Sequence, residues 1–257
     1  PANIHEYTLK NGLKLIVRED HRAPVAMLSV WYKVGGSYEH DGITGISHML
    51  EHMMFRGTPT YGPGELVKIV NQSGGSYNAM TGDDYTMYFE KVSVDKLPKM
   101  FELEADRMRH LTLSRDLFAK EKQVVMEERR MRVDDNPRSL TVERLNAAAH
   151  VNNPYHHPTV GWMTDIKHLT VKDLRAWYQV YYAPNNAVVV VVGDVKPEKI
   201  RALAGQYFEP LAAHEIPVSK PRTEVTPLGK RYVLVKAQTK LPWLVMAYNV
   251  PEITTAK

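Results

Sequence analysis

The histidine pair His48 and His52, with Glu51 between them, restricts the fold of this chain more than any other feature. Residues at i and i+4 of an α-helix lie one turn apart and about 40° apart around the axis, so a helix lets both imidazoles reach one metal ion. Glu51 follows His48 by three residues, where its carboxylate can meet a metal-bound water without being a ligand. The composition gives about 0.03 such motifs by chance, so the pattern indicates a metal centre on a helix.

An alternative interpretation makes the histidines ordinary side chains of an amphipathic helix and Glu51 a solvated charge. Two histidines also leave zinc under-coordinated, because a catalytic zinc site usually has three protein ligands and a water molecule. The chain has no cysteine, which excludes disulfides, thiolate nucleophiles and Cys-ligated zinc. A third ligand must therefore be a histidine or a carboxylate from elsewhere in the chain.

The composition excludes several other classes of protein. The 257 residues are 44% apolar, which is typical of globular proteins of one large or two small domains. The net charge of +4 is scattered without a basic run, so we expect no nucleic-acid partner. The longest uncharged apolar run, residues 187–193, is far shorter than the roughly 20 residues of a membrane span. The sequence begins at Pro1 without an initiator methionine, which is compatible with a removed leader or a trimmed chain, and between compartments we favour the bacterial periplasm over the cytoplasm.

Residue patterns predict strands and helices that are mixed rather than alternating. Apolar and polar residues alternate on both sides of Asn11-Gly12, which predicts a hairpin of residues 6–10 and 13–18. Helical spacing over residues 94–151, broken near 112–114 and at Pro137, predicts three successive helices. Similar patterns predict strands at 25–34, 76–81, 85–92 and 187–192, and helices at 44–56, 65–72, 171–182 and 197–208.

The C-terminal part of the chain has a different character. Residues 211–229 are rich in proline and polar side chains, which indicates a linker. Two further strands are predicted after it, at residues 231–237 and 241–249.

Residues 45–58, GISHMLEHMMFRGT, resemble the signature of the pitrilysin, insulysin and mitochondrial processing peptidase family of zinc metallopeptidases, which have the HxxEH motif. In that family a downstream glutamate is the third zinc ligand, and the family spacing falls on Glu128, with Glu127 as a neighbouring rival. A further family glutamate one heptad earlier corresponds to Glu121, about 20° from Glu128 around a helix. We expect Glu121 to support a ligand rather than to bind the metal. Taken alone, Glu128 would be interpreted as an i, i+4 salt pair with Arg132.

The resemblance extends over nearly the whole chain. Residues 74–81, GGSYNAMT, resemble the family segment that enters the edge strand of the active-site sheet, where relatives bind substrate. An extended peptide can pair its backbone with such an edge, and we expect Asn78 and Ala79 to contact it. The alternative is a Gly-Gly turn followed by an ordinary strand in which Asn78 is one more polar residue.

His156 and His157 raise the question of a second metal site. Adjacent histidines on a strand or loop are expected to point apart, and no carboxylate accompanies them at ligand spacing. We therefore assign them to a surface loop.

The resemblance implies an α+β fold in which a mixed, mainly antiparallel sheet packs against a set of helices, as one half of a two-domain, chamber-forming peptidase. Residues 1–215 are then the zinc-binding peptidase domain. Residues 216–257 are a linker and the first strands of a second, similar domain that is absent here.

The implied activity is a zinc-dependent endopeptidase that hydrolyses short or unfolded peptides. One Zn²⁺ per chain is held by His48, His52 and Glu128, and Glu51 takes a proton from the metal-bound water and returns it to the leaving amine. A His2Glu site also accepts cobalt or manganese. In family members a second domain, or a homologous subunit, supplies an arginine and a tyrosine that contact the substrate. We therefore expect this chain to need such a partner.

Two other functions compete with this one. A non-catalytic assembly subunit of a heteromeric peptidase would keep the fold and the zinc site. A metal-storage or metal-sensing module would not require a glutamate beside its second ligand, which speaks against it. The sequence does not specify cleavage preference, physiological substrate or whether the oligomer is homomeric or heteromeric.

Overall fold

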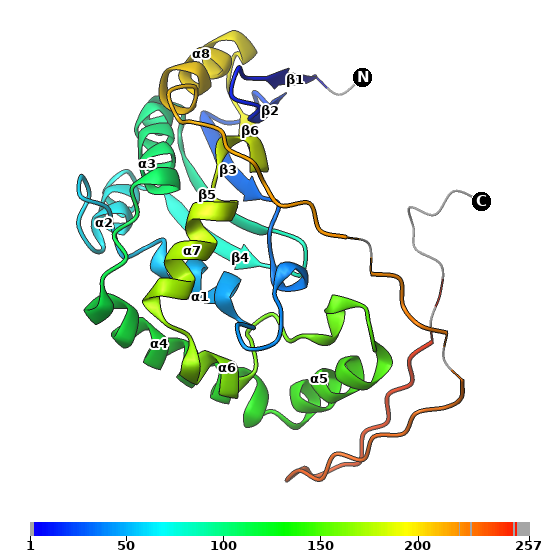
Figure 1. Ribbon diagram of the computed structural model, residues 1–257. Coiled ribbons are helices and arrows are strands. Elements are labelled where there is room, and N and C mark those ends of the chain that lie inside the picture. The colour runs from blue at the N-terminus through cyan, green and yellow to red at the C-terminus, as the bar shows by residue number, and fades with distance from the viewer. Residues whose placement is uncertain (1–2, 221, 227, 249, 251–257) are drawn as a thin grey trace.

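The segments of alternating residues build one sheet in the computed structural model, which describes residues 3–220, 222–226, 228–248 and 250. In this part of the chain six strands are ordered β1-β2-β6-β3-β5-β4 (Figure 1). All neighbouring strands are antiparallel except β2 and β6, which confirms the predicted mixed, mainly antiparallel sheet. The strands are β1 (Ile4–Thr8), β2 (Lys14–Glu19), β3 (Val25–Tyr32), β4 (Ser76–Thr81), β5 (Thr86–Ser93) and β6 (Ala187–Gly193).

The helices form where apolar residues recur at helical spacing, and the stretch after β5 gives three of them, as predicted. The helix α6 is additional to the predicted set. No helix in the described ranges combines the length and apolar character that crossing a bilayer requires. The α-helices are α1 (Ile46–Met53), α2 (Glu65–Gln72), α3 (Leu97–Arg109), α4 (Arg115–Arg129), α5 (Pro137–Ala149), α6 (Met163–His168), α7 (Val171–Tyr181) and α8 (Pro197–Phe208).

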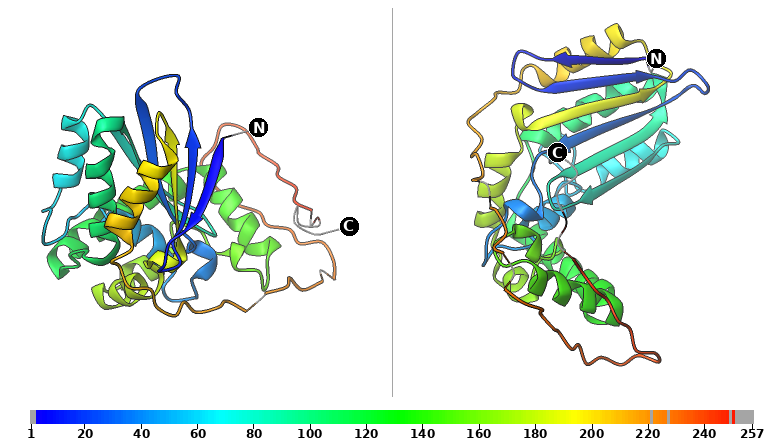
Figure 2. Two further views of the ribbon diagram at one scale, coloured as in Figure 1. Left: turned by 90° about the horizontal axis from the view of Figure 1, so that it is seen from above. Right: turned by 90° about the vertical axis from the view of Figure 1, so that its right-hand side faces the viewer.

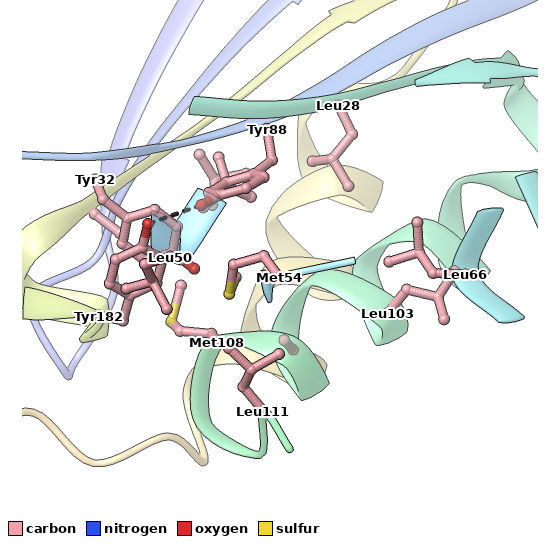
Figure 3. Close-up of a cluster of buried hydrophobic side chains, with 14 of the residues drawn as sticks. Leu28, Tyr32, Leu50, Met54, Leu66, Tyr88, Leu103, Met108, Leu111 and Tyr182 are labelled. Atoms are coloured by element: carbon pink, nitrogen blue, oxygen red, sulfur yellow. Dashed lines mark hydrogen bonds between the residues drawn. The ribbon is translucent and has the colours of Figure 1, made fainter. Parts of the chain in front are cut away.

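The helices α2, α3 and α8 lie together on one face of the sheet, and α1 lies between the end of the sheet and α4 (Figure 1, Figure 2). The core fills the space between the sheet and these helices. Leu50 and Met54 extend from the α1 segment into a cluster that also holds Tyr88 and Tyr182, whose hydroxyl groups are 2.7 Å apart (Figure 3). One side of α1 is thereby fixed in the core, and the rest of the helix is available for a site.

A buried ion cluster joins the sheet to α3. The guanidinium of Arg107 contacts Glu90 of β5 at 3.0 Å and donates from Nε to Glu104 at 2.9 Å. All three side chains are buried. Burial, with the charge of Glu104, raises the pKa of Glu90 well above its ordinary value. The site therefore favours the protonated form of Glu90 beside the arginine.

The opposite face of the sheet carries half-buried apolar side chains. Along β3, Leu28 points into the core, whereas Met27 and Trp31 point away from it. The register sets Trp31 opposite Val188 of β6 and Met87 of β5 on that outer face. Figure 2 (right) shows the sheet from this side, with the helices behind it. A largely apolar face is therefore left for contacts outside this layer of helices.

The two strands predicted near the C-terminus are wrong for the residues that the structure describes. Residues 231–237 and 241–248 contain no strand, and Asn249 lies outside the described residues. Leu234 and Leu241 are exposed, and the segment runs as extended chain away from the sheet (Figure 1). A single strand needs a neighbour to satisfy its backbone and cover its apolar face, and these residues have none here. The assignment of residues 216–257 to a second domain stays a prediction, and its last residues, 251–257, lie outside the described ranges.

Candidate metal centre

The helix α1 is positioned by its N-terminus. Gly45 precedes it with φ = +84°, a conformation that glycine adopts without strain, so the helix begins at Ile46 rather than at residue 44. The buried carboxylate of Glu39 accepts hydrogen bonds from the backbone N–H groups of Gly45 at 2.6 Å and Ser47 at 2.8 Å. Burial raises the pKa of Glu39 to about 8, although both hydrogen bonds favour its ionised form. These contacts fix the first turn, from which His48 projects.

The helix α4 brings the predicted glutamates to α1. Ser114 accepts a hydrogen bond from Leu117 N at its start, and α4 is continuous to Arg129 before a π-helical turn, Arg130–Asp134. Glu121 and Glu128 share the face that meets α1. Glu127 instead pairs with Arg130 at 2.7 Å and is largely exposed. The continuous helix that the sequence interpretation assumed is therefore present between Glu121 and Glu128.

His48, His52 and Glu128 converge. One ligand atom from each lies within 4.8 Å of the other two. Glu128 Oε2 is 3.1 Å from Nε2 of His52 and 3.7 Å from Nε2 of His48. Two imidazole nitrogens and a carboxylate oxygen match the donors of catalytic zinc sites, so these residues fit zinc. Arg132 also contacts Glu128, at 2.8 Å from Oε1, so both sequence interpretations of Glu128 describe contacts that exist.

A second carboxylate contacts His52 on the side of the ring away from Glu128. Its Nδ1 is 2.9 Å from Oε1 of Glu121, and Arg56 contacts the other oxygen of Glu121 at 2.6 Å. A carboxylate accepts hydrogen bonds, so Nδ1 donates to Glu121, and Nε2 is the ring nitrogen that faces Glu128 and would be open to a metal in place of the proton it shares with that carboxylate. The structure therefore places Glu121 where the sequence predicted a supporting residue, and it adds Arg56, which the sequence analysis did not single out.

The two histidines have opposite electrostatic surroundings. Burial lowers the pKa of His48 to about 4, and the nearby His52 contributes. Burial acts against the charge of His52 as well, but its hydrogen bonds to Glu121 and Glu128 raise its pKa to about 9. The hydrogen bond from His52 lowers the pKa of Glu128. The centre therefore combines one neutral imidazole with an imidazole and carboxylate that share a proton, which a bound cation would replace.

Glu51 stands on the flank of α1 that faces β4. Thr81, the last residue of β4, donates its hydroxyl hydrogen to Oε2 of Glu51. Burial raises the pKa of Glu51, while this hydrogen bond acts to lower it. Thr81 lies in the segment 74–81 that resembles the family, but the sequence analysis assigned it no role. Its contact with Glu51 depends on how β4 packs on α1.

A cleft of about 690 Å³ joins α1, β4 and α4. β4 is an edge strand of the described sheet, so the outer side of its backbone is available for pairing. Asn78 accepts a hydrogen bond from the N–H of Ala79 at 2.9 Å, and both predicted substrate-binding residues line the cleft. Its walls are formed by His48, Glu51, His52, Asn78, Ala79, Met80, Thr81, Val124, Glu127, Glu128, Met131 and Arg132.

His156 and His157 differ from the expectation. Their rings are 4.0 Å apart between centroids rather than pointing apart, and Asp41 supplies the carboxylate that the sequence seemed to lack. Nε2 of His157 is 3.0 Å from Oδ1 of Asp41. The separation of 116 residues hid this carboxylate from any argument based on local spacing.

Comparison with known proteins identifies the family. Residues 14–161 match the family described as Insulinase (Peptidase family M16), and residues 168–257 match the one described as Peptidase M16 inactive domain. The chain belongs to this family, which confirms the resemblance found at residues 45–58. The second match spans α7, which packs on α1, β6, which lies inside the sheet, and α8, which packs on β2 and α3.

Individual relatives agree with this assignment. The zinc protease PqqE of Helicobacter pylori is 40% identical over 95% of this chain and 56% of its own length. The uncharacterized zinc protease YmxG of Bacillus subtilis is 31% identical over 77% of this chain and 48% of its own length. The crystal structure of a protease from Helicobacter pylori matches with a TM-score of 0.83 at 40% identity, covering 87% of this chain and 54% of that one. The chain thus spans about half the length of the curated relatives that it matches.

Proposed function

We propose that this chain is the zinc-holding half of an endopeptidase that hydrolyses short or unfolded peptides. The observation that carries the proposal is the convergence of His48, His52 and Glu128 beside Glu51 in one cleft. Relatives named zinc proteases support the choice of metal. The chemistry that a bound zinc ion supplies is polarisation of the scissile carbonyl and activation of a water molecule.

Glu51 is the proposed proton carrier. Burial moves its pKa upward, toward the range in which a general base is most effective near neutral pH. Thr81 anchors one carboxylate oxygen, so the other is presented in a fixed direction. Glu51 would accept a proton from the attacking water and return it to the nitrogen of the leaving amine. Without that proton the nitrogen would have to leave as an amide anion, which is a poor leaving group.

The substrate would bind as an added strand. Along the free edge of β4, backbone groups can pair with an extended peptide, which gives affinity with little dependence on side chains. The N–H of Ala79 now donates to Asn78, so an incoming carbonyl would compete with that side chain. Met80, Val124 and Met131 are exposed apolar residues on the cleft wall, and they suit apolar substrate side chains. Most of the backbone of a folded protein is already paired, which favours short or unfolded peptides.

A second half would complete the enzyme. Two observations support this part of the proposal: the relatives are about twice as long as the matched region, and the outer face of the sheet carries half-buried apolar residues such as Met27 and Trp31. A second domain or homologous subunit over that face would enclose the cleft. It would also supply an arginine and a tyrosine as donors to the developing oxyanion, each commonly worth about 10²–10³ in rate.

Zinc content and hydrolysis of a fluorogenic peptide panel, measured together on this chain with a homologous second half, test the proposal. We expect bound zinc at the centre of His48, His52 and Glu128, and hydrolysis of unstructured peptides. Zinc binding without hydrolysis of any peptide would identify an assembly subunit. If the protein binds no zinc after incubation with an excess of zinc, the metal centre itself would be rejected.

A further inference from the structure

A second cluster of metal-binding side chains lies apart from the cleft, and we propose that Asp41, His156 and His157 bind a divalent transition-metal ion, with zinc as the best fit. One ligand atom from each residue lies within 4.8 Å of the other two. Ligands of a tetrahedral zinc ion with bonds of about 2.1 Å lie about 3.4 Å from one another. Side-chain movements of about 1 Å would therefore close the cluster around an ion.

His156 is already in the required tautomer. Its Nδ1 is 2.9 Å from the carbonyl oxygen of Asn153, which can only accept a hydrogen bond. Nδ1 therefore carries the hydrogen, and Nε2 keeps its lone pair for a metal. Histidine ligands in metalloproteins commonly donate their second ring N–H to a backbone carbonyl in this way, which fixes the orientation of the ring.

His157 lacks the partners of an ordinary core histidine. Its side chain is 2% exposed, and Nδ1 has no hydrogen-bond partner among the described residues. Buried polar atoms are rarely left without a partner, so this ring is not fully explained by the hydrogen bonds of the fold. Its Nε2 faces Oδ1 of Asp41 at 3.0 Å, a spacing close to that of two ligands of one ion. An ion in place of the shared proton would bind both groups.

The cluster is reachable from solvent. The side chain of Asp41 is 91% exposed, whereas that of His157 is buried, so the ligands reach from the surface into the interior of the molecule. An ion can approach from the side of Asp41 and keep water in its remaining position, because three protein ligands do not complete a tetrahedral site.

An ion here would join two loops that position the first metal centre. Asp41 lies in the loop before α1, and the histidines lie in the loop between α5 and α6. The two loops touch at Gly45 and Gly161, where a Cβ atom on either glycine would come within 2.6 Å of the opposite backbone. The proposed ion is therefore structural: it would tie together the backbone from which α1 begins, without taking part in peptide hydrolysis.

Zinc stoichiometry of the full chain and its variants tests this inference independently of the proposed peptidase. We expect two zinc ions in the wild type, one in His156→Ala, one in Asp41→Asn, one in the His48→Ala/His52→Ala double variant, and none when His156→Ala is added to that double variant. His168→Ala is the matched control, because it removes an exposed histidine near the same loops whose Nδ1 also contacts a carbonyl, that of Thr164.

Thermal unfolding gives a second reading that does not depend on hydrolysis. Added zinc should raise the Tm of the His48→Ala/His52→Ala variant, and the rise should disappear with Asp41→Asn, an exposed substitution that spares the buried ring. Two results would overturn the second site. The wild type could bind one zinc ion and the double variant none, or the wild type could bind two zinc ions and keep both in His156→Ala and in Asp41→Asn. Neither result would touch the assignment of the first.

Discussion

His52 contacts a different glutamate of α4 with each ring nitrogen: Nδ1 lies 2.9 Å from Oε1 of Glu121, and Nε2 lies 3.1 Å from Oε2 of Glu128. The ring is therefore fixed between a supporting carboxylate and a candidate metal ligand seven residues further along the same helix. Arg56 holds the supporting carboxylate in place. This relationship determines which nitrogen of His52 is available to a metal.

Glu121→Gln should lower zinc affinity by roughly 10- to 100-fold without abolishing binding. An amide is a weaker acceptor than a carboxylate, and it can no longer pair with Arg56 as an ion, so the ring loses its orientation. Competition with a chelator of known affinity measures the change. Glu127→Gln is the matched control, since it makes the same substitution on α4 at a glutamate that pairs with Arg130 rather than with a histidine of the centre. Equal affinity in both variants would reduce Glu121 to a structural residue.

Alanine variants distinguish the three candidate zinc ligands from the neighbouring Glu127. His48→Ala, His52→Ala and Glu128→Ala should each lose the zinc of this centre, because two donors remain where catalytic zinc sites have three protein ligands. Glu127→Ala should retain it, since Glu127 pairs with Arg130 outside the cluster. Metal analysis after dialysis measures the content. Loss of zinc from the Glu127 variant alone would reverse the assignment of the third ligand.

Thr81→Val should lower kcat about tenfold while zinc content stays the same. Valine keeps the shape of threonine but cannot donate to Glu51, and a tenfold loss corresponds to about 1.4 kcal/mol, close to the lower end of the range for hydrogen bonds to charged groups. Because the lost bond acts to lower the pKa of Glu51, the acid limb of the kcat profile should move to higher pH. Thr81→Ser should restore both quantities. An unchanged pH profile in the valine variant would show that Thr81 does not position Glu51.

The buried cluster around Arg107 predicts a pH dependence of stability. The pKa of Glu90 in the folded chain is raised above its ordinary value of 4.5, so the unfolded chain releases this proton first as the pH rises. The contribution of Glu90 to the free energy of unfolding is therefore complete below about pH 4.5 and declines above it, by up to about 1.4 kcal/mol per pH unit. Glu90→Gln should remove this decline.

Urea unfolding from pH 5 to pH 8 measures these differences. The wild type should lose stability relative to Glu90→Gln as the pH rises, because only the wild type has the proton to lose. Parallel curves for the two proteins would contradict a raised pKa of Glu90.

Much of the fold was predictable because local residue patterns determine it. The run of valines in β6 and the bounds of α8, from Pro197 to Phe208, follow from periodicity and from proline at the first helical turn. Glu128 was different, because its local pattern indicates a salt pair with Arg132, and that pair exists. Only the resemblance to a family pointed to a ligand.

The remaining features depend on contacts between distant parts of the chain. Asp41 meets His157 across 116 residues, and Thr81 meets Glu51 across 30, so no local pattern could reveal either pair. The strands predicted at 231–237 and 241–249 show the opposite limit. Their residues favour strands, but a strand also needs a neighbour, and the described chain provides none.

The two-half account predicts a difference in activity between this chain alone and the completed assembly. Residues 1–257 alone should bind zinc but hydrolyse peptides poorly, because in this account the second half supplies the oxyanion donors and closes the chamber. A homologous second half should raise the rate by at least about 10², the usual value of one oxyanion donor. Rate assays with and without that half, at equal zinc content, measure the effect. Equal rates would defeat the two-half account and leave the zinc assignment untouched.

The hydrolysis rate of Glu51→Gln, measured at full zinc content and with the second half present, tests the central claim most directly. Glutamine fills the same space but can neither accept nor return a proton. We predict a preparation that binds zinc as the wild type does and hydrolyses peptides at least about 10²–10⁴ times more slowly. A zinc-loaded Glu51→Gln enzyme that works at the wild-type rate would contradict the account.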